Sequence, residues 1–170
     1  MHEIEQLDVD NLIDDIARRL AQRIQAQGLD DPALVGIRTG GAWLAKRLQR
    51  KLKWAAAPGE LNIAFYRDDF SRIGMHPTVE PSQLPFDVDE RHLILVDDIL
   101  YTGRTVRAAM NEIFDYGRPR SIQLVVLIDR GGRELPIDAH VYGARVTLPP
   151  GTHVKLHGPD PLRLELCATK

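Results

Sequence analysis

The sequence has little cysteine, no long apolar run and no excess of charge of either sign, and each absence excludes a class of protein. Its one cysteine, Cys167, cannot form a disulfide within the chain, so the fold does not depend on a disulfide framework. No apolar run approaches the length of a membrane-spanning helix, and the N-terminal segment MHEIEQLDVD is acidic, unlike a signal peptide. We therefore expect a soluble, cytoplasmic protein.

The balance of charge gives no global argument for nucleic-acid binding. Lys and Arg number 22 against 24 Asp and Glu, which leaves a formal net charge of −2, although a local basic face is still compatible with this total. The 170 residues are 44% hydrophobic and 27% charged, which is ordinary for a soluble globular protein. This length is typical of one domain with a substantial core, so we predict a single domain over residues 1–170.

The stretch LILVDDILYTGRTV, residues 93–106, joins a predicted buried strand to polar groups. Its apolar start, residues 93–96, is typical of a strand buried on both faces, and Asp97 and Asp98 follow directly. We expect a short turn at Ile99-Leu100-Tyr101 and then a helix start at residues 102–105, where free backbone N–H groups can bind an anion. Ligands of open α/β sheets bind at the carboxyl ends of the strands, so this stretch predicts the active site.

Similar units surround this stretch. A predicted strand over 33–37 leads through the turn Thr39-Gly40-Gly41 into a helix from about 42 to 53, and the glycines allow the backbone to approach a ligand closely. We expect further strands over 61–66 and 121–128, helices over 8–27 and 104–116, and edge strands with a cap over about 135–170. The alternation predicts an α/β domain with a largely parallel central sheet flanked by helices. The proline-containing loop at about 67–86 is predicted to be a lid.

An acidic pair followed by an anion-binding turn fits a sugar phosphate. The phosphate would bind the amides and hydroxyls of Thr102 to Thr105, and Asp97 and Asp98 would accept hydrogen bonds from ribose hydroxyls. The segment is neither a Walker A loop, because it lacks Gly-Lys-Ser/Thr, nor a dinucleotide-binding fingerprint.

The motifs together are similar to those of a known family. LILVDDILYTGRTV resembles the phosphoribosyl-pyrophosphate (PRPP) motif of type I phosphoribosyltransferases, and VGIRTGGAWLAKRL, FYRDD and GRPRSIQLVVLIDRGGRELPI resemble the PyrR family of pyrimidine operon regulators and uracil phosphoribosyltransferases. The resemblance covers roughly residues 34–142. It implies a type I phosphoribosyltransferase fold with a small C-terminal hood, and association into homodimers or higher homo-oligomers. It also implies Mg2+ and the reaction of uracil with PRPP to give UMP and pyrophosphate.

The resemblance also implies roles for individual residues. Asp97 and Asp98 would be catalytic and would act on Mg2+ through water or substrate, while Arg67, at the root of the lid, would add a cation next to pyrophosphate. The implied PRPP- and nucleotide-binding residues are Thr39, Gly40, Gly41, Val96, Asp97, Asp98, Ile99, Leu100, Tyr101, Thr102, Gly103, Arg104, Thr105, Asp129 and Arg130. No histidine is given a catalytic role.

The sequence departs from the family pattern in two places, and we expect these differences to affect PRPP binding and RNA binding. The family's glycine turn commonly reads Thr-Arg-Gly, whereas this chain has Gly40 in the middle position, so we expect an active enzyme that binds PRPP more weakly. The family's RNA-binding regulators use a basic face. Here Asp138 and Ala144 stand where Arg and Lys are frequent, and Asp14 and Asp15 add negative charge to the first helix. Each lost cation removes a phosphate contact, so we expect weakened RNA binding.

The sequence leaves two other functions open. One is a non-catalytic regulator that senses nucleotides through the same cradle and acts on RNA or protein. The other is a transferase for a purine base, since the C-terminal segment that contacts the base diverges most. The intact Asp97-Asp98 pair favours catalysis, because a sensor of UMP needs the phosphate cradle more than the carboxylates.

Overall fold

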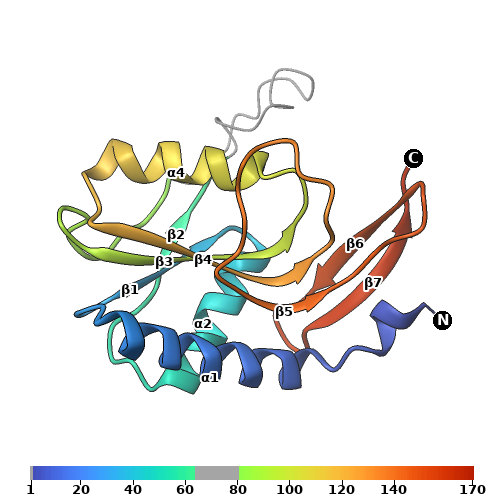
Figure 1. Cartoon of the computed structure of the whole chain (residues 1–170), viewed down its shortest axis with the longest axis horizontal. Coiled ribbons are helices and arrows are strands. Elements are labelled where there is room, and N and C mark those ends of the chain that lie inside the picture. Colours follow the sequence, from blue (N-terminus) through green and yellow to red (C-terminus); the bar gives the residue numbers. More distant parts are fainter. Residues whose placement is uncertain (1, 64–80) are drawn as a thin grey trace.

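The computed structural model of this chain, which describes residues 2–63 and 81–170, has a five-stranded parallel sheet and a separate two-stranded hairpin (Figure 1). The strand order in the larger sheet is β2-β1-β3-β4-β5, and every pairing in it is parallel. The elements are η1 (Glu3–Gln6), α1 (Val9–Gln27), β1 (Ala33–Ile37), α2 (Gly40–Leu52), β2 (Gly59–Leu61), β3 (His92–Leu100), α4 (Arg104–Tyr116), β4 (Ser121–Asp129), β5 (Val141–Arg145), β6 (Thr152–His157) and β7 (Arg163–Ala168).

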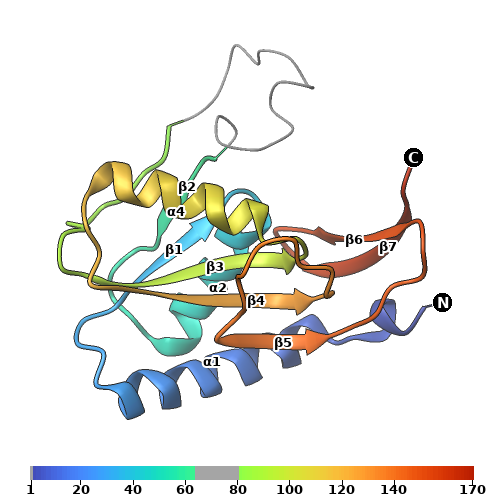
Figure 2. The same ribbon diagram turned by 45° about the horizontal axis from the view of Figure 1, so that its top comes forward.

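Helices cover both faces of the sheet, which confirms the predicted α/β architecture. α1 and α2 lie on one face and α4 lies on the other (Figure 2). Alternate residues of β3 serve the two layers, because successive side chains of a strand point to opposite faces. Ile94 and Val96 belong to the core cluster beneath α1 and α2, whereas Leu93 and Leu95 belong to the cluster beneath α4. This double burial explains the unbroken apolar run.

The ends of the helices follow from local chemistry. The Asp8 side chain accepts a hydrogen bond from the Asn11 N–H at 3.1 Å and caps α1, and Gly28, with φ 60°, ends it in the left-handed region that favours glycine. α2 begins at Gly40, earlier than the predicted start near Ala42, because the glycine turn itself forms the first helical turn. Among the described residues, no helix has the length and apolar character needed to span a membrane.

One predicted turn is wrong, and two predictions fall partly outside the described residues. The segment Ile99-Leu100-Tyr101 does not form a turn, because β3 continues to Leu100 through the pairing of Ile99 with Ile128 and of Leu100 with Asp129. The strand predicted over 61–66 is found as Gly59–Leu61, and its residues 64–66 lie outside the described part. Most of the predicted lid, residues 67–80 with Arg67, also lies outside it.

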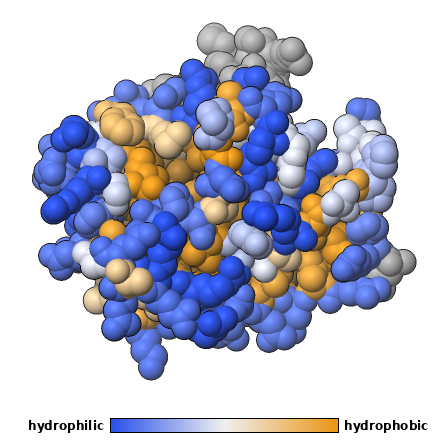
Figure 3. Space-filling model, in the orientation of Figure 1, coloured by the Kyte–Doolittle hydropathy of each residue, from blue (hydrophilic) through white to orange (hydrophobic). Residues whose placement is uncertain are grey.

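The C-terminal third adds one edge strand to the sheet and the hairpin beside its carboxyl edge. β5 pairs with β4, whereas β6 and β7 pair only with each other, next to η1 (Figure 1). A methyl group on Gly158 would lie 2.7 Å from the Trp43 ring, and the Arg47 guanidinium donates to the Pro159 carbonyl at 3.1 Å. The hairpin is therefore packed closely on α2. Figure 3 shows apolar residues over the hairpin on the right and further apolar patches toward the centre and left of a largely hydrophilic face.

Candidate active site

A cavity of about 520 Å³ lies at the carboxyl ends of β1 and β3, between the first turn of α2 and the hairpin strand β6. Several residues that the sequence analysis singled out line this cavity: Thr39, Gly40, Asp97, Asp98, Ile99 and Thr105. Other lining residues carried no predicted role: Ile37, Arg38, Trp43, Ile63, His153, Val154, Lys155 and Leu156. The predicted acidic pair and glycine turn therefore share one cavity.

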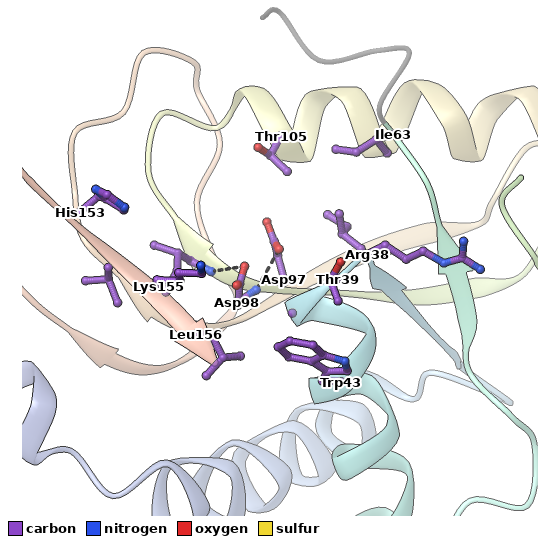
Figure 4. Close-up of a pocket in the computed structure, with 14 residues that line it drawn as sticks. Arg38, Thr39, Trp43, Ile63, Asp97, Asp98, Thr105, His153, Lys155 and Leu156 are labelled. Atoms are coloured by element: carbon purple, nitrogen blue, oxygen red, sulfur yellow. Dashed lines mark hydrogen bonds between the residues drawn. The ribbon is translucent and has the colours of Figure 1, made fainter. Parts of the chain in front are cut away.

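The acidic pair belongs to β3, and backbone hydrogen bonds orient both carboxylates. Asp97 Oδ1 accepts from the Asp98 N–H at 2.9 Å, and Asp98 Oδ1 accepts from the Ile99 N–H at 2.9 Å. Asp97, only 5% exposed, extends toward Thr105, whereas Asp98 lies beside the start of α2 (Figure 4). Because neighbouring residues of a strand point in opposite directions, the pair can present one carboxylate to each helical layer.

The glycine turn brings the backbone of α2 against this pair. A methyl group on Gly40 would lie 2.3 Å from Asp98 Oδ2, and one on Gly41 would lie 2.4 Å from the Val96 carbonyl oxygen. Thr39, the N-cap residue, makes no side-chain cap hydrogen bond, and the Arg38–Thr39 peptide is cis. The first N–H groups of an α-helix have no partner within the helix, so this turn offers donors to an anion in the cavity.

The second segment predicted to bind an anion is the start of α4. Gly103, with φ 93°, precedes the helix, and the Arg104 N–H donates to Thr102 Oγ1 at 3.2 Å. The Thr102 carbonyl accepts hydrogen bonds from the N–H groups of Glu134 at 2.9 Å and Leu135 at 3.1 Å. The turn is therefore held from outside by the segment that follows β4, a contact that the sequence analysis did not foresee.

Asp129 is buried at the end of β4 and lies outside the cavity described above. Its carboxylate accepts from Arg133 Nη2 at 2.8 Å, from Arg145 Nε at 3.1 Å and from the Gly131 N–H at 3.0 Å. Burial raises the pKa of Asp129, but these donors lower it by more, so the net pKa lies below its usual value. Asp129 lines a second cavity of about 470 Å³ together with Arg133 and Arg145.

Arg130 also lies away from the acidic pair. Its guanidinium stacks 3.9 Å from the centroid of the Tyr101 ring, and its Nη2 donates to the Thr152 carbonyl at 3.3 Å. Its Nε is buried and has no hydrogen-bond partner among residues 2–63 and 81–170. Arg130 thus connects the end of β4 to the start of β6.

Charge around the glycine turn is already partly neutralised. Arg38 Nε lies 3.0 Å from Glu60 Oε2, and Lys46 Nζ lies 3.2 Å from Glu60 Oε1. Burial raises the pKa of Glu60, but Arg38 and Lys46 lower it by more, so its net pKa falls below the usual value. Arg38, the cation just upstream of the turn, is therefore already paired with Glu60.

The carboxylates of Asp97 and Asp98 can hold Mg2+ only if the substrate supplies further ligands. In the described ranges, no cluster of three or more His, Cys, Asp or Glu side chains could hold a metal ion. Mg2+ is commonly bound by one or two carboxylates together with water and substrate phosphates. Asp97 and Asp98, which share one cavity with the first residues of α2 and with Thr105 of α4, match that mode of binding.

Comparisons with known proteins agree with this site. The phosphoribosyl transferase domain matches residues 4–154. The Bifunctional protein PyrR of Nitrosococcus oceani is 57% identical over 94% of this chain and 92% of its own length, and that of Pseudomonas syringae pv. syringae is 51% identical over 91% of each.

Solved structures show the same fold. The hypoxanthine phosphoribosyltransferase of Trypanosoma cruzi, as a point mutant in a ternary substrates complex, has a TM-score of 0.64 and 22% identity over 95% of this chain and 90% of that chain. A 1.4 Å crystal structure of the same enzyme gives a TM-score of 0.63 and 19% identity, with 95% and 93% coverage. The chain therefore has the type I phosphoribosyltransferase fold and belongs to the PyrR family.

Proposed function

We propose that this protein is a uracil phosphoribosyltransferase that converts uracil and PRPP into UMP and pyrophosphate, and that it serves pyrimidine gene regulation as a PyrR protein. The observation that carries the proposal is the single cavity in which the Asp97-Asp98 pair lies beside the glycine turn of α2 and Thr105 of α4. Family membership at 57% identity with a Bifunctional protein PyrR supports it.

In this proposal, separate segments of the site bind the 5′-phosphate, the pyrophosphate and the ribose of PRPP. The 5′-phosphate binds at Thr102 to Thr105, where the helix dipole of α4 favours an anion. The pyrophosphate binds at the Thr39-Gly40-Gly41 turn through backbone N–H groups. Asp97 and Asp98 accept hydrogen bonds from the ribose hydroxyls, which fixes the ring between the two anion sites.

The carboxylates also suit the charge that develops in the reaction. Breaking the bond between C1 of the ribose and pyrophosphate gives an oxocarbenium-like ribose, as in glycosyl transfer. Asp97 and Asp98 are held by the backbone N–H groups of Asp98 and Ile99, so they can stabilise positive charge without reorganising. Mg2+, held near this pair and mainly by the substrate's oxygens, would neutralise the leaving pyrophosphate. Arg67 as a further cation for pyrophosphate stays a prediction.

The test is nucleotide formation from PRPP and Mg2+ with uracil, hypoxanthine or guanine in parallel. We expect UMP from uracil and no product from either purine. Product from a purine base would favour the purine-specific alternative, and no product from any base would favour a nucleotide-sensing regulator.

Asp98→Asn tests the carboxylate itself. The variant keeps an oxygen for the Ile99 N–H but loses the negative charge, so we expect kcat to fall about 100-fold while UMP affinity changes much less. Asp14→Asn, which alters an exposed carboxylate on α1, is the matched control and should behave as wild type. An unchanged kcat in Asp98→Asn would remove this carboxylate from the mechanism.

A further inference from the structure

We propose that Lys155, on the hairpin strand β6, is a side-chain cation that binds the pyrophosphate group of PRPP in this protein, in addition to Mg2+. The inference rests on the proposed function and adds a binding residue to it. The reason is the charge of the ligand and of the cavity. Pyrophosphate is a multiply charged anion, yet the cavity is lined by two carboxylates, Asp97 and Asp98, and by a turn that offers only backbone donors.

In this chain the glycine turn supplies no positive charge from its middle position, which is Gly40. Any side chain at Gly40 would begin 2.3 Å from Asp98 Oδ2, so a basic residue there would displace the carboxylate. Arg38, next to the turn, is held by Glu60 at 3.0 Å. A cation for pyrophosphate is therefore more readily supplied from another side of the cavity.

Lys155 lies on such a side. His153, Val154, Lys155 and Leu156 of β6 all line the cavity; Val154 and Leu156 are buried in the core, whereas Lys155 is exposed. In Figure 4, Asp97 and Asp98 lie between β6, which carries Lys155, and the chain at Arg38 and Thr39. A flexible lysine side chain at this position can reach an anion bound over the acidic pair.

The ammonium group of Lys155 is also available to bind an anion. Its cross-strand neighbour is Glu165, whose carboxylate is engaged by His157. Within residues 2–63 and 81–170, Lys155 itself makes no ion pair or side-chain hydrogen bond. An exposed lysine beside two carboxylates, without a partner of its own, is placed to gain a partner when an anion binds.

Contacts at both ends of β6 hold the strand, and therefore Lys155, at the cavity. At the start of the strand, the Thr152 carbonyl accepts from Arg130 Nη2 at 3.3 Å. Beyond its end, Gly158 packs against the Trp43 ring, and Arg47 donates to the Pro159 carbonyl at 3.1 Å. These contacts fix the position of β6, and with it that of Lys155, at the cavity.

The experiment measures pyrophosphate and UMP binding separately, each with Mg2+, by titration calorimetry on the full chain. Lys155→Gln should weaken pyrophosphate binding about tenfold and leave UMP binding within about twofold, because UMP lacks the pyrophosphate group. Lys155→Arg should restore most of the affinity. Lys51→Gln, which removes the same charge from a lysine paired with Asp14, is the matched control.

Two results would overturn the inference. One is equal pyrophosphate affinity of Lys155→Gln and wild type. The other is an equal loss for both ligands, which would indicate a structural effect. Failure of the proposed function gives a different result: the wild type would form no nucleotide from any base. The difference in pyrophosphate affinity between wild type and Lys155→Gln would still test the role of Lys155. If the enzyme is active, the same variant should raise the KM for PRPP about tenfold and leave the KM for uracil unchanged.

Discussion

At the scale of single residues, Gly40 shows how closely backbone and carboxylate meet in the site. From the sequence, the lack of an arginine at this position is interpreted as a lost cation that weakens PRPP binding. In the structure, the position faces Asp98 Oδ2 at a distance that leaves no room for a Cβ atom. The glycine therefore allows Asp98 to lie beside the first turn of α2, where the helix dipole favours a negative charge.

Gly40→Ala is the direct test of that packing. The added methyl group forces Asp98 or the turn to move, so we expect kcat/KM for PRPP to fall about 100-fold. Gly28→Ala, at a position with open space but a positive φ, is the control: it should lower the free energy of unfolding by about 1 kcal/mol and leave the activity of the folded protein unchanged. Full activity in Gly40→Ala would show that the close approach is not required.

At the scale of elements, the segment after β4 holds the turn before α4 that we propose to bind phosphate. Arg133 connects Asp129, by an ion pair of 2.8 Å, to the Tyr101 carbonyl, to which it donates at 3.0 Å. The N–H groups of Glu134 and Leu135 both donate to the Thr102 carbonyl. The buried carboxylate of Asp129 thus holds the loop after β4, and this loop holds the turn before α4.

Asp129→Asn should weaken these contacts in a pH-dependent way. Removing the charge leaves Arg133 and Arg145 without their buried partner, so the free energy of unfolding at pH 7 should fall by about 2 kcal/mol. Because the folded-state pKa lies below the ordinary 3.8, the stabilisation is present above that pH and is lost as the pH falls through the folded-state pKa. Urea unfolding at pH 7 and pH 3 should therefore show a smaller difference between variant and wild type at the lower pH.

Asp138→Asn is the control for that comparison. Asp138 contacts Arg133 at 3.3 Å but is exposed, so its loss should cost less than about 0.5 kcal/mol. A pH-independent difference between Asp129→Asn and wild type would contradict the assignment of the effect to the carboxylate charge.

Elements with strong local signals could be predicted, and contacts between distant segments could not. The apolar run at the start of β3 sufficed to predict a buried strand, and the helix predicted over 8–27 agrees with α1 (Val9–Gln27). The extension of β3 to Leu100 depends on pairing with β4, which no local pattern contains. Lys155 was missed for the same reason: the alternation in THVKLH predicts a strand, but the other walls of the cavity that this strand lines come from α2 and β3.

At the scale of the whole molecule, the basic residues near β5 are largely occupied by the protein's own carboxylates. Arg18 and Arg19 on α1 both pair with Asp15, at 2.5 and 2.8 Å. Arg145 pairs with Asp129 at 3.1 Å, and Arg133 contacts Asp138 at 3.3 Å. An RNA phosphate would have to compete with these partners, and the chain as a whole has a net charge of −2.

We therefore predict that this protein binds the leader RNA of its own pyrimidine operon with a Kd above about 1 µM at 0.15 M salt, with or without UMP. Asp138→Arg should tighten binding several-fold and steepen the dependence of log K on log salt by about one phosphate contact, because it removes an exposed carboxylate and adds a cation. Asp30→Arg, the same change of charge at an exposed site beyond the far end of α1, should have a smaller effect. Filter binding over a series of salt concentrations measures both quantities. Nanomolar, UMP-stimulated binding by wild type would show that the paired arginines still contact RNA, and the internal ion pairs would then have to open in the complex.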